Sequence, residues 1–183
     1  MNKTTQTIFG ISLIVVLFAI LVFVGVGKES DTISEINTEE VKETGPKKVS
    51  EFNLKNYAGE SVTFKDIRND VVVINFWASW CPFCVNELPD FVELQKEYPE
   101  LITVVAINRA EPLSVAKEFS NKLGISDDIL LLIDSEDSFY KSIGGFSMPE
   151  TIFLNKKGEI LFHKRGPMKL EEMKEIVSPM LKN

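Results

Sequence analysis

Apolar and polar residues follow three different patterns along the chain. Residues 8–27 form an uncharged, mostly apolar run of 20 residues, and residues 28–48 carry many charged and small polar side chains but no aromatic one. From about residue 49 onward, short apolar runs recur between segments with helical spacing. This pattern predicts a membrane-spanning helix, a flexible tether and one folded domain over residues 49–183.

The folded section alternates between the periodicities of strands and helices. Continuous apolar runs predict buried strands over 71–76, 101–107 and 129–133. Alternating residues around short turns predict two β-hairpins, 52–54 with 61–64 and 151–154 with 159–164. Helical spacing predicts helices over 83–98, 112–123, 136–143 and 170–180. The alternation implies an α/β domain whose central sheet is covered by helices on both faces.

The N-terminal run is long enough to cross a bilayer. As a helix it spans about 30 Å, the thickness of the hydrocarbon core. A cleaved signal peptide is one alternative, but its apolar core is usually about 7–15 residues, and residues 25–28 match a small-residue cleavage site poorly. A buried core helix is another alternative. We predict a cytoplasmic segment over 1–7, a signal-anchor helix over 8–27 and an extracytoplasmic domain, an orientation that Lys3 favours weakly.

Composition narrows the function classes. The chain has 183 residues, with 20 Lys and Arg against 27 Asp and Glu, which gives a formal net charge of −7. Binding to nucleic acid requires a basic face, so this composition argues against a nucleic-acid partner. One histidine and two cysteines leave few ligands for a zinc site. We therefore expect no metal and no cofactor other than the cysteines themselves.

The two cysteines, Cys81 and Cys84, stand where a buried strand passes into a helix. Two intervening residues at a helix start place the sulfur atoms on one turn, close enough to bond. Pro82 suits the first helical position, so Cys81 is expected at the N-cap. Unpaired backbone N–H groups and the positive end of the helix dipole then lower its pKa and favour the nucleophilic thiolate. Cys84, one turn into the helix, is expected to be the resolving thiol.

Three other roles of the cysteine pair compete with that of a redox-active dithiol. A purely structural disulfide closes too short a ring to add much stability. A metal site needs more ligands, although two sulfurs can hold a soft cation such as Cu(I). A peroxidatic cysteine usually follows a Thr or Ser three positions earlier, where this chain has Ala78. A redox-active dithiol is therefore the favoured interpretation.

Two separated motifs resemble one known family. The first is Asn75-Phe76-Trp77-Ala78-Ser79-Trp80-Cys81-Pro82-Phe83-Cys84 followed by Glu87-Leu88-Pro89, and the second is Ser147-Met148-Pro149-Glu150-Thr151. Together they resemble membrane-anchored thioredoxin-like proteins of the TlpA/ResA type, over about residues 49–183 and the anchor. The resemblance implies a thioredoxin-like fold preceded by an N-terminal β-hairpin extension.

The resemblance also implies a surface that binds substrate around the cysteines. The proline matching Pro149 is cis in the family and faces the disulfide, and the Met148 position supplies backbone groups that pair with a substrate strand. A strand-start proline is the plainer alternative. Trp80 is expected to offer a flat surface that contacts partner proteins. Pro82 and Phe83, which lie between the cysteines, are also expected to bind substrate.

The proteins of the TlpA/ResA type carry a glutamate where this chain has Glu87. At the position of Asn75, which cannot titrate, thioredoxin itself has a buried aspartate that assists proton transfer to the resolving cysteine. Glu87 lies three residues after Cys84, on the same helix face. Burial there raises the pKa of a carboxyl and allows proton exchange. A solvated glutamate near the helix start is the alternative.

These features predict a thiol-disulfide oxidoreductase that acts on extracytoplasmic protein thiols and disulfides. By resemblance we expect a reductase recharged by a membrane thiol-electron transporter, with apocytochrome c thiols or protein thiols in general as substrates. A disulfide-forming oxidase, a copper carrier on the same fold and a peroxidase are the rival functions. The isolated His163 is expected to be an exposed or hydrogen-bonded residue without a catalytic role.

Overall fold

A computed structural model describes residue 49 and residues 52–67 and 69–182. The predicted anchor over 8–27 and tether over 28–48 lie outside these residues. Within the described part of the chain, no helix combines the length and the apolar character that crossing a membrane demands.

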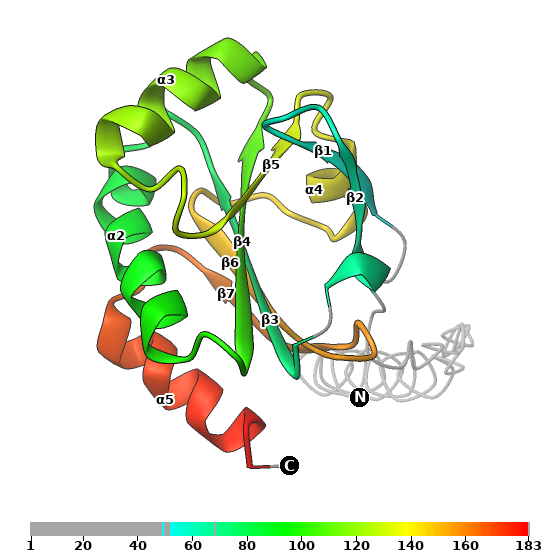
Figure 1. Cartoon of the computed structure of the whole chain (residues 1–183), viewed down its shortest axis with the longest axis vertical. Helices are drawn as coiled ribbons and strands as arrows, with labels where there is room; N and C mark the ends of the chain where they lie inside the picture. The colour runs from blue at the N-terminus through cyan, green and yellow to red at the C-terminus, as the bar shows by residue number, and fades with distance from the viewer. Residues whose placement is uncertain (1–48, 50–51, 68, 183) are drawn as a thin grey trace, which may run out of the picture. The chain divides into compact units, whose positions relative to one another are not determined.

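The sheet has seven strands in the order β2-β1-β5-β4-β3-β6-β7 (Figure 1). The strands are β1 (Asn53–Asn56), β2 (Ser61–Thr63), β3 (Val71–Trp77), β4 (Ile102–Arg109), β5 (Leu130–Asp134), β6 (Glu150–Asn155) and β7 (Ile160–Arg165). The helices are α2 (Pro82–Glu97), α3 (Leu113–Leu123), α4 (Ser138–Ser142) and α5 (Leu170–Met180), with a 3-10 turn, η1, at Phe64–Asp66.

Strand β3 is the centre of the arrangement. Every residue from Val71 to Trp77 is buried, as expected for a strand covered on both faces. It runs parallel to β4 and antiparallel to β6, with Phe76 opposite Glu150. The end of β3 therefore lies beside the start of β6, although Trp77 and Glu150 are 73 positions apart in the chain.

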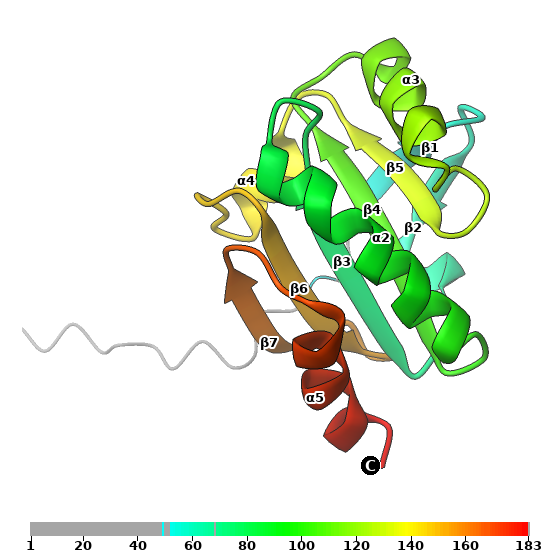
Figure 2. The ribbon, with the colours of Figure 1, turned by 90° about the vertical axis from the view of Figure 1, so that its left-hand side faces the viewer.

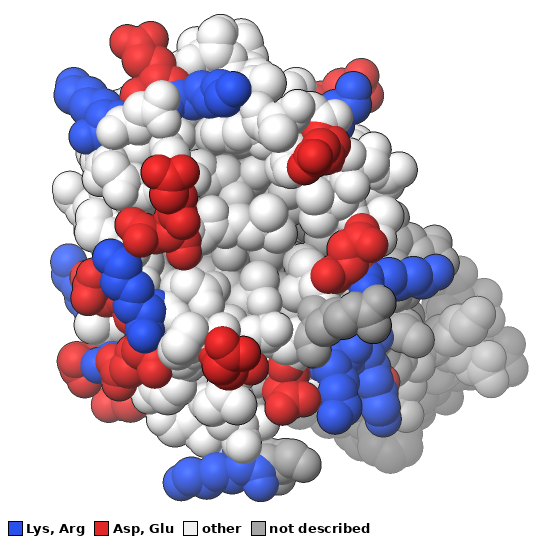
Figure 3. Space-filling view, viewed as in Figure 1, with Lys and Arg blue, Asp and Glu red and all other residues white. Residues whose placement is uncertain are grey.

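Helices cover both faces of the sheet, as predicted. Residues of α2 and α5 pack with one set of β3 and β4 side chains, and apolar residues of α3 lie against the same core. Residues of α4, β1 and η1 form a second core on the opposite face. Figures 1 and 2 show α2, α3 and α5 on one side of the sheet and α4 on the other. On the face drawn in Figure 3, lysines and arginines are interspersed with acidic side chains.

Most predicted elements differ from the structure by one or two residues at an end, and two of these differences have a clear cause. The first hairpin has its second strand at Ser61–Thr63, and Phe64 opens η1 instead of ending that strand, because Thr63 and Asp66 cap the turn reciprocally. The helix predicted over 136–143 is only Ser138–Ser142. It starts late because the carboxylate of Asp134 accepts hydrogen bonds from the Ser138 and Tyr140 N–H groups.

Candidate active site

The cysteine pair opens helix α2, directly after β3. Cys81 is the N-cap, Pro82 is the first helical residue, and the two sulfur atoms form a disulfide with the Cα atoms 5.3 Å apart. The backbone N–H of Cys84 donates to Cys81 Sγ over 3.2 Å. No acidic residue lies in the first turn of α2, so no side chain of that turn opposes the effect of the positive helix end on Cys81.

The two cysteines are both buried but differ slightly in exposure. Cys81 is 3% exposed and Cys84 is 0% exposed, so of the two residues only Cys81 presents any surface to an incoming disulfide. Trp80 and Phe83 stand out beside it, 63% and 60% exposed, and Pro82 is also exposed. Trp77, by contrast, is fully buried in the core.

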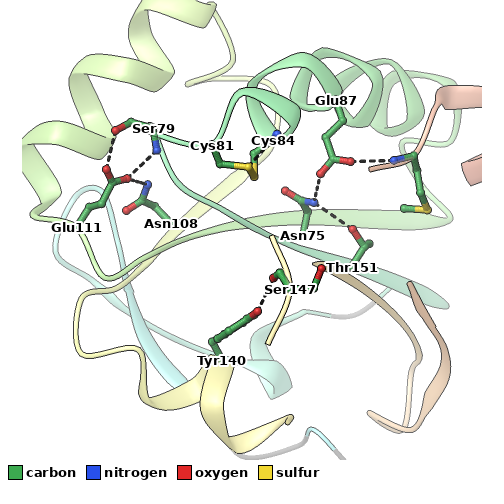
Figure 4. The surroundings of a disulfide bond; sticks show 11 residues. Asn75, Ser79, Cys81, Cys84, Glu87, Asn108, Glu111, Tyr140, Ser147 and Thr151 are labelled. Atoms are coloured by element: carbon green, nitrogen blue, oxygen red, sulfur yellow. Dashed lines mark hydrogen bonds between the residues drawn. A yellow bond between two sulfur atoms is a disulfide. The ribbon is translucent and has the colours of Figure 1, made fainter. Parts of the chain in front are cut away.

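Beneath the disulfide, Glu87 is held in a buried polar network (Figure 4). The amide nitrogen of Asn75 donates to Glu87 Oε1 over 2.7 Å and to Thr151 Oγ1 over 3.0 Å. The Met168 N–H donates to Glu87 Oε2 over 3.0 Å. Burial raises the pKa of Glu87 to about 7, although both hydrogen bonds act in the opposite direction. The group can therefore take up or release a proton near neutral pH, one turn from Cys84.

A second carboxyl group, on Glu111, holds the turn that leads into the cysteines. Its Oε2 accepts from the Ser79 N–H over 2.8 Å and from the Asn108 amide over 2.7 Å, and its Oε1 accepts from the Ser79 hydroxyl over 2.6 Å. Ala110, with φ of 55°, turns the chain so that Glu111 points at this loop. Sequence reasoning missed Glu111, although a polar residue such as Asn108 ending an apolar strand is a signal for such a site.

Replacing Glu111 with alanine is expected to destabilise the oxidised protein by about 1–3 kcal/mol, because the Ser79 N–H and the Asn108 amide lose their acceptor. Urea unfolding followed by tryptophan fluorescence measures this change. Glu118, which is exposed on α3, provides the matched control, since its replacement by alanine removes a carboxyl group without these bonds. Equal stability of the two variants would contradict a structural role for Glu111.

The second motif forms the other side of the site. The Met148–Pro149 peptide bond is cis, Pro149 is buried and Met148 is partly buried. The Ser147 carbonyl accepts a hydrogen bond from the Tyr140 hydroxyl, and the Pro149 carbonyl accepts one from the Gly166 N–H over 2.9 Å. Because β6 pairs antiparallel with β3, this loop lies at the same end of the sheet as the start of α2. Figure 4 shows Ser147 and the disulfide in this region.

His163 lies away from the cysteines, on β7. Its Nε2 atom lies 2.6 Å from Oε1 of Glu150, so the side chain is hydrogen bonded. Within the residues that the structure describes, no group of three or more His, Cys, Asp or Glu side chains could hold a metal ion.

Comparison with known proteins agrees with this geometry. Residues 42–178 match the Redoxin family. Sporulation thiol-disulfide oxidoreductase A of Bacillus subtilis is 31% identical over 142 residues, which cover 74% of this chain and 83% of that protein. Thiol-disulfide oxidoreductase ResA of Halalkalibacterium halodurans is 32% identical over 132 residues, 70% of this chain and 74% of that one.

Solved structures show the same fold. The crystal structure of StoA from Bacillus subtilis matches with a TM-score of 0.59 and 29% identity, covering 68% of this chain and 93% of that chain. MTB dsbF, in mixed oxidised and reduced forms, matches with a TM-score of 0.66 and 26% identity, covering 75% and 99%. The chain therefore belongs to the redoxin family, and within it to the thioredoxin-like thiol-disulfide oxidoreductases of the ResA and StoA type.

Proposed function

We propose that this protein is an extracytoplasmic protein-disulfide reductase, anchored by residues 8–27 and recharged by a membrane thiol-electron transporter. Apocytochrome c before haem attachment is one substrate that the resemblance to the TlpA/ResA type implies, and other secreted thiol proteins are compatible with the same site. The length of the uncharged N-terminal run supports the anchoring.

The acidic surroundings of the cysteine pair are the observation that carries the reducing direction. Glu87 is buried three residues after Cys84, and Glu111 binds Ser79, two residues before Cys81. Negative charge on Glu111, and on Glu87 once it has lost its proton, disfavours a thiolate relative to a disulfide. A dithiol whose reduced form is not stabilised gives up its electrons readily, whereas a strong oxidant stabilises its reduced form. The helix N-terminus acts in the opposite direction, and its effect is concentrated on Cys81, which is the N-cap of α2.

Reduction then proceeds by two exchange steps. The Cys81 thiolate attacks one sulfur of the substrate disulfide, the substrate S–S bond breaks, and the released substrate thiolate takes a proton. Cys84 gives its proton to Glu87 and attacks Cys81 Sγ, which breaks the mixed disulfide and expels the second substrate sulfur as a thiolate, and this thiolate takes the proton from Glu87. Two electrons pass from the cysteine pair to the substrate, together with one proton from Cys84 and one from solvent, which had received the proton of Cys81 when that thiol ionised.

Trapping with Cys84→Ser in the full-length protein tests this function. Without the resolving thiol, we expect mixed disulfides between Cys81 and extracytoplasmic proteins to accumulate and to dissolve in dithiothreitol. Alkylation of wild-type cells should find the pair mainly as free thiols, as a reductase requires. Cys81→Ala/Cys84→Ser is the control that cannot form adducts. A pair found as a disulfide in cells, with adducts to newly secreted thiols, would identify a disulfide-forming oxidase instead.

A further inference from the structure

Phe146 is the most exposed large apolar side chain among the described residues, at 77%. Scattered apolar residues are common on protein surfaces, but an aromatic ring so fully exposed beside a reactive group indicates a contact with another molecule. Trp80 and Phe83 are the next most exposed, and both flank Cys81. None of the three rings packs against another aromatic ring in the described structure.

The pairing of β3 with β6 brings Phe146 to the same end of the molecule as the cysteines. Phe76 lies opposite Glu150, so the residues before Glu150 run beside those that follow Phe76. Phe146 thus lies at this end, on the loop that also contains Pro149. Trp80 and Phe83 flank Cys81 at the start of α2, at the same end of the sheet. Figure 2 shows the α4–β6 connection and the start of α2 at this common end.

A buried carboxylate fixes the backbone of Phe146. Glu150, 0% exposed, accepts on Oε2 from the Phe146 N–H and the Ser147 N–H, each over 3.1 Å, and from the Tyr140 hydroxyl over 2.8 Å. These hydrogen bonds favour the ionised carboxyl and lower the pKa of Glu150 against the effect of burial.

The same carboxylate also fixes the ring of Phe146 through β7. Glu150 Oε1 lies 3.2 Å from Nε of Arg165 and 2.6 Å from Nε2 of His163. The guanidinium carbon of Arg165 lies 4.5 Å from the centre of the Phe146 ring, a cation–π distance. One face of the ring therefore rests on a cation that a buried anion holds in place, and the ring is presented in a defined orientation.

We propose that Phe146 is a specificity residue of the exchange reaction and that Glu150 is its positioning residue. The occupant is a substrate polypeptide with an aliphatic or aromatic side chain within a few residues of its reacting cysteine. Thiol exchange at Cys81 requires the substrate chain to cover this end of the molecule, so the surface is continuous with the contact that the reaction itself makes. The inference rests on the proposed disulfide reduction and names its substrate class.

Two peptide disulfides of equal length test the proposal, one with Leu and Phe beside the reacting cysteine and one with Ser and Asn there. Wild-type protein, kept reduced, is expected to favour the apolar peptide in kcat/KM. Phe146→Ala is expected to lower this preference about tenfold, chiefly by raising KM. Leu161→Ala, which removes an exposed apolar side chain elsewhere on β7, is the control and should keep the wild-type preference.

A double-mutant cycle separates positioning from general damage. Glu150→Gln keeps an acceptor for the two N–H groups but loses the negative charge that holds Arg165, and it should lower the preference about threefold to tenfold. In the Phe146→Ala background, Glu150→Gln should lower it no further. Glu159→Gln, at the far end of the β6–β7 hairpin, is the matched control.

The outcomes distinguish the two proposals. A wild-type protein that reduces neither peptide contradicts the proposed function. A wild-type protein that reduces both, with a preference that Phe146→Ala leaves unchanged, overturns this inference alone. A concentration-dependent dimer in gel filtration that Phe146→Ala abolishes would also overturn it, since a second copy of the chain would then be the occupant.

Discussion

The Cys81→Ser variant is expected to lose disulfide exchange, with kcat/KM lowered by at least about 10³-fold. A serine hydroxyl is almost never ionised near neutral pH, and Cys84, at 0% exposed, presents no surface to an incoming disulfide. Reduction of a peptide disulfide by the dithiothreitol-treated protein measures the loss.

Cys84→Ser serves as the comparison for this result. It should retain the first exchange step and stop at the mixed disulfide, because Cys81 keeps its place at the N-cap of α2. Mass spectrometry of the unquenched mixture would show a stoichiometric adduct with Cys84→Ser and none with Cys81→Ser. The reverse pattern would mean that the buried sulfur is the nucleophile, and the assignment of roles would be wrong.

The sequence predicts well whatever depends on residues close together in the chain. The buried run of β3, the helix that starts at Pro82 and the N-cap position of Cys81 follow from local patterns, and the structure confirms these elements. The start of α4 was wrong by two residues because the carboxylate of Asp134, on the preceding strand, fixes where the helix begins.

Other parts of the site depend on contacts between distant residues, which no local pattern contains. Glu111 binds Ser79 across 32 positions of sequence, and Glu150 binds His163 across a strand pair. Glu150 entered the sequence prediction only as part of a motif, since its burial becomes visible only once β6 and β7 are paired. An alternating pattern shows which residues face inward, but not which inward residues meet.

Glu87→Gln is expected to change how stability depends on pH. Below pH 4.5 the Glu87 carboxyl is protonated in the folded and unfolded chains alike. Because burial raises its folded pKa from 4.5 to about 7, the unfolded chain releases its proton first as pH rises. The folded wild-type protein therefore loses about 3 kcal/mol of stability between pH 4.5 and 7. The glutamine variant avoids this loss, so its free energy of unfolding in urea, relative to that of wild type, should rise by this amount between pH 4.5 and 7. Glu100→Gln, on the surface, is the control and should show no such rise.

The same substitution should slow the second exchange step about 100-fold at pH 7, because Cys84 loses the group that takes its proton. In wild type the rate at which the mixed disulfide resolves should rise with pH through an inflection near 7, the pKa of Glu87. In Glu87→Gln this inflection should disappear, leaving only the rise that comes from ionisation of the thiol itself. Asn75 can hydrogen bond Glu87 in both protonation states, since its amide offers a donor or, after rotation, an acceptor. Rapid-quench measurement of the mixed disulfide from pH 5 to 9 provides the test, and an unchanged inflection in the variant would assign it to a group other than Glu87.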